Sequence, residues 1–106
     1  MNLPKRLMVG PHVYTVSYKE RLVDAGTHML GLASHNEENK IELDTLLKTN
    51  DTMRGEVFLH EILHVLSRNY NLDLEEEKIK VLAPALLDVI RRNKLDFLFK
   101  DARSTK

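Results

Sequence analysis

The chain has 106 residues with no cysteine, no net charge and no long apolar run, and each absence removes a class of protein. Without cysteine there is no disulfide framework and no thiolate metal site, so zinc would need His, Asp or Glu ligands. The 16 acidic and 16 basic residues balance, which argues against nucleic acid or an anionic membrane as the main partner. No run approaches the length of a membrane span, and residues 1–6 contain no apolar signal core. We therefore expect a cytoplasmic protein.

What the chain does contain is the segment His60-Glu61-Ile62-Leu63-His64, an HExxH pattern. On a helix, residues four apart lie one above the other with Cβ atoms about 6 Å apart, so both imidazoles can bind one ion. Zn²⁺ accepts neutral imidazole nitrogen, and Glu61 is placed beside the metal, where it can act as general base. A metal-free helix is the plain alternative. Helical context is indicated by the apolar neighbours Val57, Phe58, Leu59, Val65 and Leu66.

The first half of the chain is rich in short alternating segments typical of strands. Residues 6–9 and 12–18 flank a Gly-Pro turn and predict a β-hairpin. Residues 29–34 and 40–44 flank a polar turn and predict a second hairpin, with Ile41 and Leu43 facing the core. Between the hairpins we expect a connection over residues 19–29, with a short helical turn at 20–24.

The second half predicts two main helices. Residues 45–50 form a loop or short helical turn, and Asn50-Asp51-Thr52 offers N-cap oxygens for a helix over 52–69 that carries the HExxH pattern. A second helix spans 74–93, with a kink near Lys80 or a restart at Pro84. Residues 94–100 predict a short third helix, and 101–106 a polar tail. The second helix has an apolar stripe of Ile79, Leu82, Ala83, Leu86, Leu87 and Ile90.

These elements predict an α+β fold. We expect a small antiparallel or mixed sheet of three or four strands, packed on the HExxH helix and on the second helix. The whole chain, residues 1–106, is predicted to be a single domain.

A third metal ligand is expected from the acidic cluster Glu75-Glu76-Glu77 at the start of the second helix. Glu76 lies in phase with the centre of the buried stripe, Glu75 lies at its edge, and Glu77 points away. We therefore predict His60, His64 and Glu76 as the ligands, with Glu75 in reserve. The alternative is an acidic first turn that interacts only with the helix dipole.

The HEILH helix, the short link and a second helix with an acidic first turn resemble the gluzincin class of zinc metallopeptidases. More closely, they resemble the minimal phage- or mobile-element-borne proteins related to the ImmA/IrrE-like and SprT-like families. The resemblance covers roughly residues 30–93. It implies a minimal zincin-like domain with His60 and His64 as ligands, a glutamate from 75–77 as third ligand, and Glu61 as general base.

The predicted function is zinc-dependent peptide-bond hydrolysis, with Glu61 taking a proton from a metal-activated water. The partner would be a peptide or protein substrate, held as an added strand against the third or fourth strand. Tyr70 and His35 are candidates for stabilising the oxyanion, although a surface or packing role is the simpler assignment for each. The alternative function is a zinc-stabilised, non-catalytic binding or regulatory module, phage-encoded, or a metal-free protein with a vestigial motif. His12 and His28 are further metal-ligand candidates, each with a surface role as the simpler assignment.

Overall fold

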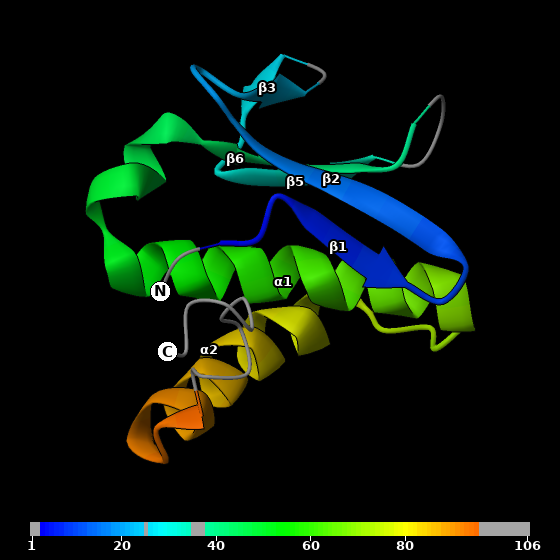
Figure 1. Cartoon of the computed structure of the whole chain (residues 1–106), viewed down its shortest axis with the longest axis vertical. Helices are drawn as coiled ribbons and strands as arrows, with labels where there is room; N and C mark the ends of the chain where they lie inside the picture. Colours follow the sequence, from blue (N-terminus) through cyan, green and yellow to red (C-terminus); the bar gives the residue numbers. More distant parts are fainter. Residues whose placement is uncertain (1–2, 25, 35–37, 96–106) are drawn as a thin grey trace.

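Alternating segments of the first 44 residues pair into a four-stranded mixed sheet, as expected for the α+β fold (Figure 1). In this computed structural model, β1 (Arg6–Val9) and β2 (His12–Lys19) form an antiparallel hairpin. β5 (Gly31–Ser34) pairs antiparallel with β6 (Lys40–Asp44), and β6 runs parallel to β2. The order β1-β2-β6-β5 leaves β5 as an edge strand, which later forms one wall of the candidate site.

The structure describes residues 3–24, 26–34 and 38–95. Within these residues, a short additional hairpin follows β2 where the sequence predicts a helical turn. β3 (Val23–Asp24) and β4 (Thr27–His28) pair antiparallel, so the short helical turn predicted at 20–24 is wrong. The reason is a long-range contact. Leu22 is buried, and its backbone N–H donates to the buried carboxylate of Asp44 at 3.0 Å, which holds the segment in extended form.

The HExxH pattern lies in a long helix whose start and end follow from local sequence. A 3₁₀ turn, η1 (Thr45–Thr49), leads into α1 (Asp51–Tyr70), which agrees with the predicted helix to within one residue at each end. Asn50 caps α1 by accepting the Met53 N–H at 3.1 Å. Asn71 ends the helix in the left-handed conformation, with φ of 55°.

The second helix, α2 (Glu76–Arg92), folds back along α1. Its last turn is joined to the first turn of α1 by an ion pair of 2.7 Å between Arg91 and Asp51. α2 continues through Pro84, so the restart predicted there is wrong; the kink near Lys80 stays a prediction. Proline removes one backbone hydrogen bond from α2. The helix continues because its apolar face packs on α1.

Two apolar clusters bury opposite faces of α1, so α1 is the middle layer between the sheet and α2 (Figure 1). Leu82 and Leu86 of the predicted stripe are 38% and 40% exposed, so the buried stripe of α2 is narrower than the sequence predicts. The sheet-side cluster contains Val9, Tyr14, Ile41, Leu43, Leu47, Phe58 and Val65. The α2-side cluster contains Leu59, Leu63, Ile79, Ala83 and Leu87.

Part of the expected C-terminal structure falls outside the described residues. The short helix predicted over 94–100 is described only as far as residue 95, and the predicted tail 101–106 is not described. In the described part of the chain, no helix is both long and apolar enough to cross a membrane.

Candidate metal centre

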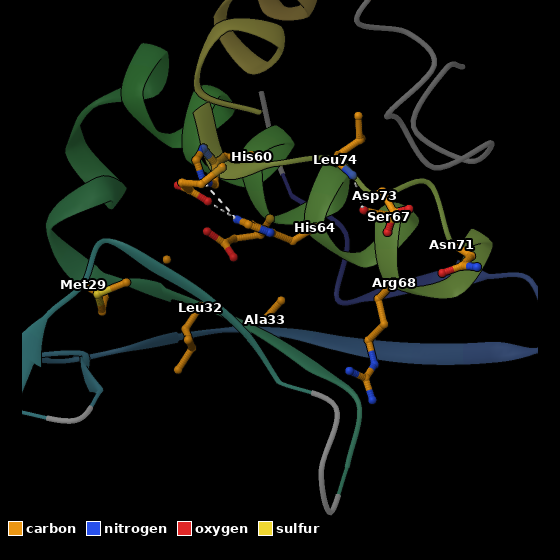
Figure 2. A pocket seen from close by; sticks show the side chains of 13 residues that line it. Met29, Leu32, Ala33, His60, His64, Ser67, Arg68, Asn71, Asp73 and Leu74 are labelled. Carbon is orange, nitrogen blue, oxygen red and sulfur yellow. Dashed lines mark hydrogen bonds and ion pairs between the residues drawn. The ribbon is translucent and has the colours of Figure 1, made fainter. Parts of the chain in front are cut away.

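Two histidines of α1 and one glutamate of α2 converge in the helical hairpin (Figure 2). The Nε2 atoms of His60 and His64 lie 3.2 Å apart. Glu76 places one carboxylate oxygen 2.8 Å from His60 Nε2 and the other 2.7 Å from His64 Nε2. The three side chains are one-fifth to one-half exposed, so the group lies at the solvent edge of the hairpin.

This group fits a zinc ion. Tetrahedral zinc with bonds of about 2.0–2.1 Å to its ligands sets neighbouring ligand atoms about 3.4 Å apart. The two imidazole nitrogens lie 3.2 Å apart, close to that spacing, and each is within 2.8 Å of a different oxygen of the Glu76 carboxylate. Two imidazole nitrogens and one carboxylate are also the His₂Glu donor set that catalytic zinc uses. Among the described residues, His60, His64 and Glu76 are therefore a group that could hold a metal ion.

The link between the helices places Glu76 over the histidines. The chain turns at Asn71, and the Ser67 hydroxyl then accepts the backbone N–H of Leu74 at 2.9 Å, which holds the link against α1. Glu75 is the extended N-cap residue, so Glu76 is the first residue of α2. The metal group therefore depends on hydrogen bonds in the last turn of α1 as well as on the ligands.

The glutamate favoured by helix phase is the one that lies against the histidines, but its side chain does not point where the helix phase predicts. The structure brings Glu76 to the histidines, whereas Glu75 and Glu77 do not belong to the group. However, Glu76 does not point toward an apolar core, because its side chain is 48% exposed. Its two carboxylate oxygens instead lie against the partly exposed imidazoles of His60 and His64.

Glu61 lies on the sheet side of the same turn and is buried, with only 8% of its surface exposed. The backbone N–H of Ala33, in β5, donates to its carboxylate. Burial, and then the nearby negative charge of Glu76, raise the pKa of Glu61 to about 7, against the opposing effect of the Ala33 hydrogen bond. The carboxyl group can therefore both accept and release a proton near neutral pH.

The group opens on a groove of about 720 Å³ between α1, the inter-helix link and β5 (Figure 2). His60, Glu61, His64 and Glu76 all line it. Gly31 of β5 faces Glu61 closely: a Cβ added to Gly31 would lie 3.1 Å from the Glu61 carboxylate and 2.6 Å from a Val57 methyl group. Glycine therefore lets the edge strand approach the helix at this point.

The other candidates that lie within the described residues do not join the group. His12 is exposed at the start of β2, and His28 bonds through Nε2 to Asp44 at 2.8 Å. Tyr70 is 55% exposed and lies beside Gly10 instead of lining the groove. His35 lies outside the described residues.

The sequence does not single out Arg68, Gly31 and Ala33 as groove residues. Arg68 follows His64 by four positions on the same helix, a spacing that could have indicated it. Gly31 and Ala33 contact Glu61 from a strand that is distant in sequence, and no local pattern predicts that contact.

Comparison with protein-family models, with curated proteins and with solved structures found no match to this chain. The fold and the site together define an α+β protein with a candidate His₂Glu metal centre on a helical hairpin.

Proposed function

We propose that the protein is a zinc-dependent metallopeptidase, in which His60, His64 and Glu76 hold one zinc ion and Glu61 is the general base. The observation that carries the proposal is the buried Glu61 carboxylate beside a three-ligand group that opens on a groove. Structural zinc is enclosed by four protein ligands, whereas catalytic zinc has three and leaves one position accessible. Three converging side chains at a groove wall fit the catalytic pattern.

The chain's own residues supply the proton transfers. A bound zinc ion would lower the pKa of a water molecule and polarise the peptide carbonyl. Glu61 accepts the proton of the attacking water and later returns it to the leaving amine. The Ala33 N–H fixes the carboxylate toward the groove, so that the base is oriented before substrate arrives.

The groove also supports a peptide as the substrate. β5 pairs with β6 on one side only, and its residues Gly31, Leu32 and Ala33 line the groove. An extended peptide could bind along such an edge through backbone hydrogen bonds. Apolar side chains of Met29, Leu32 and Leu74 line the same groove and would contact substrate side chains.

The test is hydrolysis of a defined peptide mixture by the zinc-loaded protein, followed by mass spectrometry. Glu61→Gln should keep one zinc per chain and lower the cleavage rate by about 10²–10⁴-fold, because an amide cannot take the proton. His60→Ala is the matched control that should lose the metal itself. Zinc binding without any cleavage would favour the non-catalytic binding module. Loss of zinc from Glu61→Gln would assign Glu61 a ligand or structural role.

A further inference from the structure

Arg68 extends the face of α1 that carries the site. Glu61, His64 and Arg68 are spaced by three and four positions, so they follow one another along one side of the helix. Arg68 is exposed and lines the groove. Figure 2 shows its side chain extending from α1 toward the strands, at the opposite end of the groove from Met29 and pointing away from Asp73.

The guanidinium of Arg68 has no hydrogen-bond or ion-pair partner within the described residues. The arginines at the ends of the helical hairpin differ: Arg54 and Arg91 pair with Asp51, and Arg92 pairs with Asp88. Arg68 is also the one arginine or lysine among the described residues of the groove, which otherwise contains the histidines His60 and His64 and the acidic residues Glu61, Asp73 and Glu76. A free guanidinium at one end of the groove is suited to bind a negative group from outside the chain.

The distance of Arg68 from the metal ligands determines where along a bound peptide the negative group would lie. Four helical residues advance about 6 Å along the axis, and an extended peptide advances about 3.3 Å per residue. Arg68 therefore lies about two substrate residues beyond His64 if the peptide follows the groove.

We propose that Arg68 is a specificity residue that binds a carboxylate of the peptide substrate about two residues from the bond that is cleaved. This inference rests on the proposed peptidase function. The planar guanidinium binds carboxylates through two parallel N–H···O bonds, which fixes direction as well as charge. The carboxylate can come from an acidic side chain or from the free C-terminus of a peptide, since both present the same group.

The test uses peptide hydroxamates, because the hydroxamate binds zinc and fixes the register without any hydrolysis. One series extends from the hydroxamate in the N-terminal direction and a second in the C-terminal direction, each on an alanine background. In both series a single Glu, or the matched Gln, is placed one, two or three residues from the hydroxamate. In the series that extends in the C-terminal direction, a third arm replaces the Glu by a free C-terminal carboxylate at the same distance. Dissociation constants are measured by calorimetry on the zinc-loaded protein.

We expect Glu at the second position of one series to bind about tenfold more tightly than Gln at low salt. Arg68→Gln should bring that ratio to about one while the melting temperature and the zinc stoichiometry stay unchanged. Arg6→Gln is the matched control, since Arg6 is an exposed arginine on the opposite edge strand, and it should keep the preference. A preference in the third arm alone would assign the carboxylate to a peptide C-terminus.

Two failures are distinguishable. If the hydroxamates bind but neither Glu nor a free C-terminal carboxylate is preferred at any position, or if Arg68→Gln keeps the preference, this inference is overturned and the peptidase proposal stands. If no hydroxamate binds the zinc-loaded protein, the accessible metal position is absent, and both proposals fail.

Discussion

The Oε2 atom of Glu76 lies 2.7 Å from Nε2 of His64, although the two residues belong to different helices. A metal held by both would therefore cross-link α1 and α2 at the end where the link joins them. Because such a site forms only in the folded chain, the binding free energy of the metal adds to the stability of the fold. The functional site and the stability of the helical hairpin are thus expected to depend on the same three side chains.

Replacing the three neighbouring glutamates one at a time tests the ligand assignment. Glu76→Ala should weaken zinc binding by at least about a hundredfold, because it removes one of three ligands. Glu75→Ala and Glu77→Ala should change it little, since both side chains are exposed and neither belongs to the metal group. Affinity is measured by competition with a calibrated chelator. A large loss in Glu77→Ala, or none in Glu76→Ala, would place the third ligand elsewhere.

Gly31→Ala tests the close approach of β5 to α1. The new methyl group would lie 2.6 Å from the Val57 side chain, so the strand or the side chain must shift. Such overpacking should lower the free energy of unfolding by about 1–3 kcal/mol. Val57→Ala should relieve part of this clash, so the double variant should be more stable than the sum of the two single losses predicts. Urea denaturation of the wild type, the two single variants and the double variant measures these free energies of unfolding. If the losses of the two single variants simply add in the double variant, the contact between residue 31 and Val57 is contradicted.

Asp44→Asn tests the carboxylate that holds the β3–β4 hairpin. The Leu46 N–H, then His28 and the Leu22 N–H, lower the pKa of Asp44 from 3.8 to about 2. A lowered pKa in the folded state means that the ionised group stabilises the fold above about pH 4, and that this contribution disappears as the pH falls toward 2. The melting temperature of the wild type should therefore be higher than that of Asp44→Asn at neutral pH. The difference between the two melting temperatures should decrease as the pH falls from about 4 to 2. Melting curves measured across this pH range test the prediction. A difference in melting temperature that does not change with pH would contradict a stabilising role for the ionised Asp44 carboxylate.

Local patterns were enough to predict the elements that carry the site. Periodicity and the Asn50 cap located α1, and helix phase selected Glu76 among three adjacent glutamates. Both signals depend on residues within a few positions of each other. Alternation of Ile41 and Leu43 also predicted which face of β6 is buried.

Features that depend on distant contacts were not predictable in this way. The β3–β4 hairpin forms around Leu22, whose partner Asp44 is 22 residues away. The apolar stripe of α2 was correct in phase, but its width depends on how much of it α1 covers, and Leu82 and Leu86 remain exposed. The contact of β5 with Glu61 likewise requires the packed arrangement of strand and helix.

The central claim is that His60, His64 and Glu76 hold one zinc ion, and metal content combined with stability tests it most directly. Protein purified without chelator should contain one zinc per chain by elemental analysis. After chelation, zinc restored to a free concentration of about 1,000 times its dissociation constant should raise the free energy of unfolding by about 4 kcal/mol. His60→Ala and His64→Ala should lose both the zinc and the stabilisation. A wild-type protein without zinc, whose stability does not change when zinc is added, would contradict the account.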